Sequence, residues 1–239
     1  MKTVYLGDQH GRTNQELIRL QEPDADKFVY IGDYWDSFDI PFEQQMSNFQ
    51  NIIQFKKDNM DKVVLLTGNH EMHNILAFGE TYSGYQHKYA TILDSLMSEN
   101  LHLMQMAYYD DGVMCTHAGI SKVWLSLECK LNDIPYPKTP EEVEQTVNDL
   151  FKYDLGAFSF RGLDPYGDST VSSPIWIRPK SLMYPKSRIP DIVQIVGHTP
   201  QSKGIQSKAN GKYWFIDALE LDQYLVRENG EFKVKTIEH

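Results

Sequence analysis

Residues 4–11, Val-Tyr-Leu-Gly-Asp-Gln-His-Gly, combine a short apolar run with polar side chains placed directly after it. Such a run predicts a buried parallel strand, because both faces of that kind of strand are covered by apolar neighbours. Residues 28–31 and 63–66 repeat the arrangement: Gly32-Asp33 follows the first run directly, and Gly68-Asn69 follows the second after Thr67. Functional loops are therefore expected where these strands end.

A helix is predicted between the second and third of these strands. Phe42, Met46, Phe49, Ile52 and Ile53 recur at helical spacing, which gives one apolar stripe on a helix of about four turns. Alternation of strand and helix favours right-handed crossovers and a mainly parallel sheet, so the fold class is α/β.

Beyond residue 100 the pattern is richer in strands. Residues 113–116 and 192–196 are apolar and lead to His117 and to Gly197-His198. An antiparallel end-piece with a hairpin turn at Asn229-Gly230 is expected from three further runs, at residues 213–216, 224–226 and 232–234.

One helix start is marked clearly in this half of the chain. Thr139 is placed as N-cap, Pro140 at the first helical position and Glu142 three residues after the cap. Residues 132–174 are rich in Pro, Gly, Asp and Tyr, and we interpret them as a cap-like insert over the site. No linker divides the chain, so residues 1–239 are expected to form a single domain.

The composition limits the class of protein. The 239 residues are 41% hydrophobic and 23% charged, as in a globular protein. A net charge of −10 and a pI near 5.2 disfavour binding to nucleic acid or to anionic membranes. Two cysteines, no signal-peptide pattern and no membrane-length apolar run favour a cytoplasmic protein, and leave its oligomeric state open.

Five short blocks place potential metal ligands at strand ends. They occupy residues 7–11, 32–36, 68–71, 117–119 and 197–200. Adjacent strand ends would bring six side chains into one volume: Asp8, His10, Asp33, Asn69, His117 and His198. Carboxylate, amide and imidazole ligands without thiolate suit manganese, iron or zinc, and six ligands fit two ions that share one carboxylate.

The blocks GDQHG, GDYWD, GNHE, HAG and GHTP, in this order, resemble the signature of the calcineurin-like metallophosphoesterases. More narrowly, they are similar to the phosphoprotein-phosphatase branch, which includes the symmetrical dinucleoside tetraphosphatases. The resemblance extends from Asp8 to Pro200. It implies an α/β/β/α sandwich of two sheets with a dinuclear metal site at the strand ends.

The resemblance also implies which residues hold each ion. One ion would be bound by Asp8, His10 and Asp33. The second would be bound by Asp33, Asn69, His117 and His198, with Asp33 bridging the two. Two divalent ions per chain are thus expected, with manganese favoured and iron or zinc as alternatives.

In the same reading, His70 donates a proton to the leaving group, Asp36 orients its ring and Arg178 binds the phosphate. His70 is expected to point away from the ligands, toward the leaving group. The family usually has an arginine directly after the second carboxylate of the GDYWD block, but Ser37 follows Asp36 here. Arg161 is a second candidate for the missing arginine.

Two features place the chain within the superfamily: GNHE in place of GNHD, and Pro200 where branches that include nucleases usually have a second histidine. The absence of that histidine favours phosphomonoester or phosphoanhydride hydrolysis over DNA cleavage. The sequence predicts a phosphatase resembling the protein serine/threonine phosphatases, acting on a phosphoprotein or a small phosphoester. Two alternatives stay open, a symmetrical dinucleoside tetraphosphatase acting on dinucleoside polyphosphates and a non-catalytic metal-binding module. Glu71 is taken as a supporting residue, and His73, His87, His102 and His239 as structural.

Overall fold

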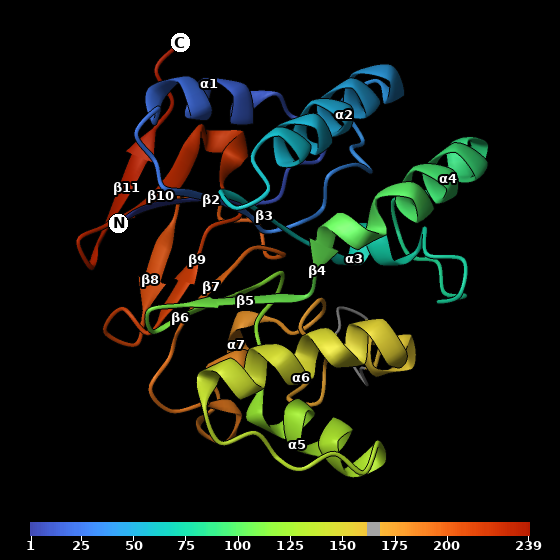
Figure 1. Cartoon of the computed structure of the whole chain (residues 1–239), viewed down its shortest axis with the longest axis vertical. Helices are drawn as coiled ribbons and strands as arrows, with labels where there is room; N and C mark the ends of the chain where they lie inside the picture. The colour runs from blue at the N-terminus through green and yellow to red at the C-terminus, as the bar shows by residue number, and fades with distance from the viewer. Residues whose placement is uncertain (162–167) are drawn as a thin grey trace.

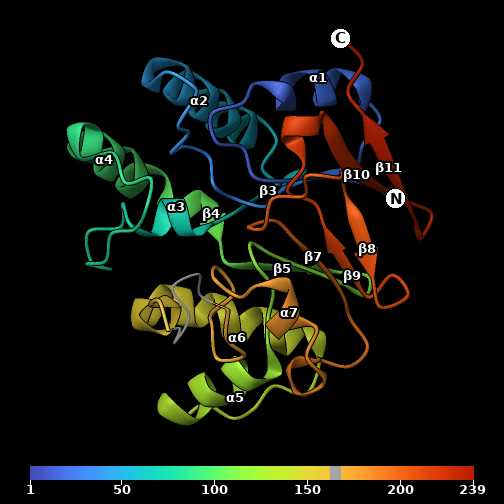
Figure 2. The same cartoon turned by 180° about the vertical axis from the view of Figure 1, so that it is seen from behind.

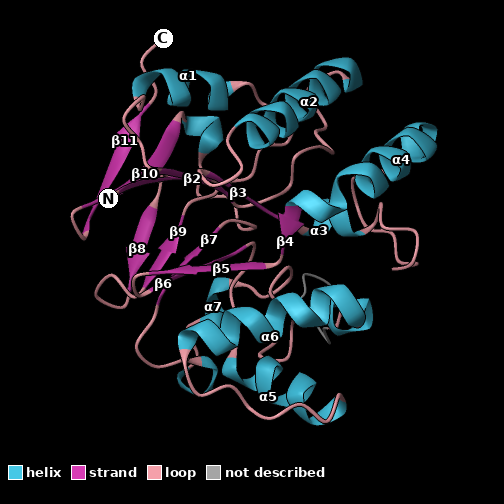
Figure 3. Cartoon of the chain, in the orientation of Figure 1, coloured by secondary structure: helices cyan, strands magenta, loops and turns pink. Residues whose placement is uncertain are grey.

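The computed structural model describes residues 1–161 and 168–239. Within these residues the strands form a six-stranded and a five-stranded sheet, with helices on both outer sides (Figures 1 and 2). Figure 3, coloured by secondary structure, shows the strands in magenta between helices in cyan. The predicted α/β fold with two sheets is confirmed.

The first sheet has the strand order β11-β10-β1-β2-β3-β4. Its strands are β1 (Lys2–Leu6), β2 (Lys27–Tyr30), β3 (Val63–Leu66), β4 (Met104–Gln105), β10 (Gln223–Glu228) and β11 (Glu231–Thr236). Strands β1 to β4 pair in parallel, and β10 and β11 extend the sheet in antiparallel pairing.

The second sheet has the order β5-β6-β7-β9-β8. Its strands are β5 (Ala107–Asp110), β6 (Val113–Thr116), β7 (Val193–Val196), β8 (Gln206–Lys208) and β9 (Tyr213–Phe215). The central strands β6, β7 and β9 are parallel, so the carboxyl ends of β6 and β7 open on the same edge.

The helices of the described residues are α1 (Asn14–Gln21), α2 (Phe42–Asp58), α3 (Asn69–Met72), α4 (Ala90–Asn100), α5 (Lys122–Leu131), α6 (Pro140–Tyr153) and α7 (Pro179–Leu182). α1 and α2 lie on one side of the sheets, and α5 and α6 lie on the opposite side (Figures 1 and 2). No helix in residues 1–161 and 168–239 has both the length and the apolar composition that crossing a membrane requires.

Alternating side chains of the parallel strands fill two different cores. Val4 and Leu6 of β1 pack in the core that includes Phe49 and Ile52 of α2. Tyr5, between them in the sequence, points to the opposite face and packs with residues of the second sheet. This alternation follows from strand geometry, and it explains why the strands of the sandwich are apolar on both faces.

The predicted start of α6 is confirmed. Thr139 Oγ1 accepts a hydrogen bond from the backbone N–H of Glu142 at 3.2 Å, and Pro140 begins the helix. Asn148 Oδ1 accepts from the N–H groups of Met106 and Ala107, both at 2.9 Å, which ties α6 to β5. Within the predicted insert, residues 162–167 lie outside the described residues.

The expected antiparallel end-piece is correct only in part. β10 and β11 do pair as a hairpin, with Asn229 and Gly230 at positive φ in its turn. β9, however, is in the second sheet and pairs in parallel with β7. The prediction of one common sheet relied on the proximity of the three runs in the sequence. By pairing with β7, β9 instead buries Tyr213 and Phe215 in the same apolar cluster as Val196.

Candidate active site

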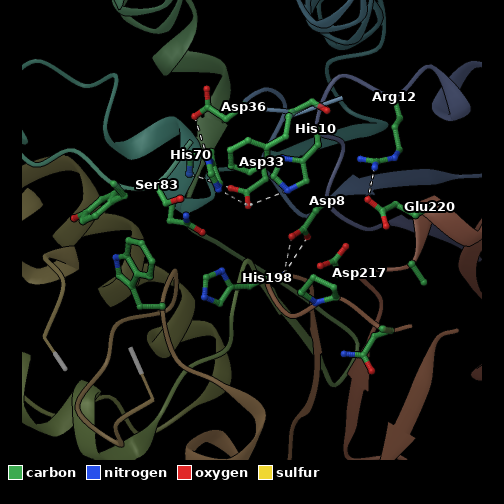
Figure 4. A pocket seen from close by; sticks show the side chains of 18 of the residues that line it. Asp8, His10, Arg12, Asp33, Asp36, His70, Ser83, His198, Asp217 and Glu220 are labelled. Atoms are coloured by element: carbon green, nitrogen blue, oxygen red, sulfur yellow. Dashed lines mark hydrogen bonds and ion pairs between the residues drawn. The ribbon is translucent and has the colours of Figure 1, made fainter. Parts of the chain in front are cut away.

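A cavity of about 1190 Å³ opens at the carboxyl ends of the parallel strands. Five of the six predicted ligands line it: Asp8, His10, Asp33, Asn69 and His198. The sixth, His117, is fully buried at the end of β6 and contacts Asn69 Oδ1 through Nε2 at 3.0 Å. The structure therefore brings all six side chains to one place, as shown in part in Figure 4.

Asp33 lies at the centre of this group. Its Oδ2 atom is 3.3 Å from His117 Nε2, 3.8 Å from His10 Nε2 and 4.0 Å from His70 Nε2. In Figure 4 the carboxylate of Asp33 lies between the rings of His10 and His70. One carboxylate thus faces histidines from three different strand ends.

Two sets of ligand atoms share Asp33. The ligand atoms of His10, Asp33 and His70 lie within 4.8 Å of one another, and so do those of Asp33, His117 and His198. Spacing of this kind is compatible with one divalent cation in each set. Asp8 lines the same cavity, and its carboxylate accepts hydrogen bonds from the backbone N–H of His198.

The ring nitrogens of these histidines are arranged as metal ligands require. His10 Nδ1 and His117 Nδ1 each contact a backbone carbonyl at 2.9 Å, that of Trp35 and that of Ile31 respectively. The carbonyls accept from Nδ1–H, which fixes both rings with Nε2 directed toward Asp33. His198 Nε2 is buried with no hydrogen-bond partner in the described part of the chain. A divalent ion would satisfy these atoms, so the residues fit a metal centre.

Four site residues have a left-handed backbone. The φ angles are 42° at His10, 53° at Asp33, 63° at Asp36 and 63° at His198. This region is uncommon for residues other than glycine and costs about 1–3 kcal/mol per residue where it is strained. The surrounding sheets hold these residues in place, and the turn directs each side chain from its strand end into the cavity.

The electrostatics favour bound positive charge. Burial would raise the pKa of Asp33, but the neighbouring rings of His117 and His70 hold it well below its usual range. Burial would lower the pKa of His117, yet the carboxylates of Asp33 and Asp8 raise it to about 10. Burial, together with His117, keeps the pKa of His198 well below its usual value, so this ring is in the neutral form that can bind a metal.

His70 and Asp36 form a hydrogen-bonded pair at the edge of the cavity. His70 Nδ1 donates to Asp36 Oδ2 at 3.0 Å, which leaves His70 Nε2 directed into the cavity. The expectation that His70 points away from the ligands is wrong, because its Nε2 atom is about as near to Asp33 as that of His10. The hydrogen bond to Asp36 turns the ring inward.

The two candidate arginines have different surroundings. Arg178 lines the cavity, and its Nη1 atom donates to the carbonyl of His198 at 2.8 Å. Arg161 instead pairs with Glu128 of α5 and is not among the cavity-lining residues that the structure describes. Arg161 is therefore unsuited to replace the arginine that is missing after Asp36.

Glu71 stabilises the backbone of two of the ligand-bearing loops. Its buried carboxylate accepts from the backbone N–H groups of Asp33, Tyr34 and Gly68 at 2.7–2.8 Å. Burial raises the pKa of Glu71 to about 7, with a further contribution from the charge of Asp33. It links the ends of β2 and β3, in agreement with the supporting role expected from the sequence.

The sequence reasoning missed Asp217 and Arg12. Asp217 lines the cavity and follows β9 as Asp33 follows β2, so the same strand-end rule could have found it. Burial and the charge of Asp33 raise the pKa of Asp217 to about 6. Arg12 comes directly after the first block, lines the cavity and pairs with Glu220 (Figure 4).

Comparison with known proteins shows the family of this chain. The family model described as calcineurin-like phosphoesterase matches residues 1–233, and the chain belongs to this family. Hydrolysis of phosphate esters is therefore the class of reaction.

Two solved structures have a similar fold. The cold-active protein-tyrosine phosphatase of a psychrophilic Shewanella species has a TM-score of 0.64 and 18% identity, over 99% of this chain and 80% of that one. A protein serine/threonine phosphatase from Saccharomyces cerevisiae, with similarity to human phosphatase PP5, has a TM-score of 0.57 and 14% identity, over 100% and 80% of the two chains.

Proposed function

We propose that this chain is a metal-dependent phosphatase that hydrolyses phosphomonoesters at a dinuclear centre. The observation that carries the proposal is the pair of ligand sets that share Asp33 within one cavity. Asp8, His10 and Asp33 would hold one divalent ion, and Asp33, Asn69, His117 and His198 the other. His70 also lies close to His10 and Asp33, but we assign it to proton transfer because Asp36 binds its Nδ1. Manganese suits these oxygen and nitrogen donors, as do iron and zinc.

When bound, the ions would supply Lewis-acid charge for the phosphoryl oxygens and activate water as the nucleophile. Arg178 would bind the equatorial oxygens of the phosphoryl group and offset their charge. His70, held by Asp36, would donate the Nε2 proton to the leaving oxygen as the bond to phosphorus breaks. All three side chains line the same cavity.

The charge of the cavity favours a monoester over a dinucleoside tetraphosphate. Two arginines line it, and one of them, Arg12, is already paired with Glu220. Carboxylates are more numerous along the same described lining: Asp8, Asp33, Asp36, Asp39, Glu80, Asp217 and Glu220. The metal ions would neutralise part of this charge, but the outer carboxylates would repel a polyphosphate chain.

Substrate choice is assigned to the segment at residues 132–174. Phe160, from this segment, lines the cavity and packs edge-on against Trp176 at a centroid distance of 5.1 Å. Deleting the segment would remove α6 and its contacts with β5, so a point substitution is the better test. Phe160→Ala is expected to change the ratio of rates on phosphopeptides and on small phosphoesters, whereas an unchanged ratio would limit Phe160 to packing.

The test of the function is a substrate panel. Metal-stripped protein is reloaded with Mn²⁺ and assayed on p-nitrophenyl phosphate, its bis ester, phosphopeptides and diadenosine tetraphosphate, with Asp33→Asn as the inactive control. We expect phosphate release from the monoesters only. Faster cleavage of diadenosine tetraphosphate would identify the tetraphosphatase alternative. Metal binding without turnover of any substrate would identify a non-catalytic module.

A further inference from the structure

The carboxylate of Asp36 accepts more hydrogen bonds than its pairing with His70 requires. His73 Nε2 lies 2.6 Å from the same oxygen, Oδ2, that His70 contacts at 3.0 Å. The other oxygen, Oδ1, accepts from Gln86 Nε2 at 2.9 Å. Three donors, two of them at the start and end of α3 and the third at Gln86, thus fix a single buried carboxylate.

These contacts are hydrogen bonds and not the outline of a third metal site. Two ligand atoms bound to one tetrahedral zinc would be roughly 3.3 Å apart, given metal–ligand distances of about 2.0–2.1 Å. The distance from His73 Nε2 to Asp36 Oδ2 is only 2.6 Å. A proton fits between these atoms, whereas a cation does not.

The surroundings of His73 fix its orientation and its tautomer. Its side chain is fully buried, with the ring of Tyr82 at 6.1 Å and that of Tyr85 at 5.0 Å between centroids. Nδ1 is buried without a hydrogen-bond partner in the described residues, so an N–H at that position would have no acceptor. The proton is therefore on Nε2, where the carboxylate of Asp36 accepts it.

We infer that His73 is a positioning residue: it holds Asp36 so that Asp36 orients His70 for proton donation. The inference rests on the proposed phosphatase function. A carboxylate held only by His70 could rotate about its side chain and let the ring turn, but His73 and Gln86 remove that freedom. Neither residue reaches the cavity lining, so their effect passes through Asp36.

The test compares His73→Leu, which removes the donor but keeps an apolar group, with His73→Gln, which keeps a donor. His102→Leu, at an exposed histidine, is the matched control. Removing a supporting hydrogen bond of this kind typically costs about 10–100-fold in activity. His73→Leu should lower kcat on phenyl phosphate by about this factor, with little change in KM or metal content, and p-nitrophenyl phosphate should be affected less. His73→Gln should recover most of the loss.

A double-mutant cycle that combines His73→Leu with Asp36→Asn adds a second criterion. If the two residues act as one unit, their losses in kcat should not be additive. Equal losses on both substrates, or additive losses in the cycle, would overturn the inference and leave His73 as a packing residue. Loss of metal with activity would instead assign it to the metal centre.

A readout without turnover separates this inference from the proposed function. Long-range ¹H–¹⁵N spectra of the metal-free protein should show His70 protonated on Nδ1 and His73 on Nε2. The proton on His70 Nδ1, which is hydrogen-bonded to Asp36, should exchange faster with water in His73→Leu than in wild type. Unchanged exchange would overturn the positioning role even if the protein proved inactive on every ester.

Discussion

The backbone N–H of His198 donates to both carboxylate oxygens of Asp8, at 3.1 and 2.9 Å, although 190 residues separate them in the chain. Asp8 follows β1 in the first sheet, and His198 follows β7 in the second. This contact closes the site where the two sheets meet. It also fixes the carboxylate by a backbone group, which leaves the His198 ring free to face Asp33.

Gly197 makes this contact possible, because a Cβ atom there would overlap Asp8 Oδ1 and approach Ile31. Gly197→Ala should displace Asp8 and weaken Mn²⁺ binding by about 10–100-fold, the range seen when the support of a metal ligand is lost. Isothermal titration would measure this, with Gly156→Ala as the control, since a Cβ there meets only Asp154. Wild-type affinity in Gly197→Ala would show that Asp8 is not needed as a ligand.

Asp33 should be needed for both ions, because both ligand sets include it. Elemental analysis should find close to two ions per chain in wild type, almost none in Asp33→Asn and about one in His117→Ala, as expected for a carboxylate shared by two metals. His87→Ala, at an exposed histidine, is the control. Two retained ions in Asp33→Asn would contradict a bridging role.

His70→Asn should slow turnover while metal content stays near wild type, because its Nδ1 is bonded to Asp36 and its role is proton donation. General-acid catalysis contributes about 10²–10⁴-fold, and more when the leaving group is basic. The loss in kcat should be large on phenyl phosphate and smaller on p-nitrophenyl phosphate. Loss of metal from this variant would show that His70 is a ligand, which its position beside His10 and Asp33 also allows.

Glu22 should make folding stability depend on acid pH. Burial would raise the pKa of its carboxyl, but hydrogen bonds from Lys2, Lys235 and Tyr224 hold it below the usual 4.5. The stabilisation is therefore fully present above about pH 4.5 and is lost as the pH falls through the lower folded-state value. Glu22→Gln should lower the free energy of unfolding by about 2 kcal/mol at pH 7, which is typical for the loss of hydrogen bonds to a charged group.

Urea unfolding of wild type and Glu22→Gln at pH 7 and at pH 3 would check this prediction. The difference in free energy of unfolding between the two proteins should be smaller at pH 3 than at pH 7. Asp24→Asn, which removes an exposed partner of Lys2, should have a much smaller effect. An equal difference at both pH values would show that the Glu22 contacts stabilise the fold through packing and not through charge.

The sequence by itself determined the features that depend on neighbouring residues. Apolar runs that end at glycine placed β1, β2 and β3, and the stripe from Phe42 to Ile53 placed α2. The same pattern marked the six side chains at the strand ends, because a strand's direction brings the residue after it to the sheet edge. Short or less apolar elements, such as β4, β8 and α1, gave no such signal.

Only the tertiary structure decided which strands share a sheet and which side chains meet across the cavity. β9 joined β7, not its sequence neighbour β10, because pairing depends on burial between distant segments. His73 had no motif to mark it, and the role proposed for it rests on a 2.6 Å contact with Asp36 across 37 residues. Contacts of this kind depend on the packing of the whole chain, which local sequence does not encode.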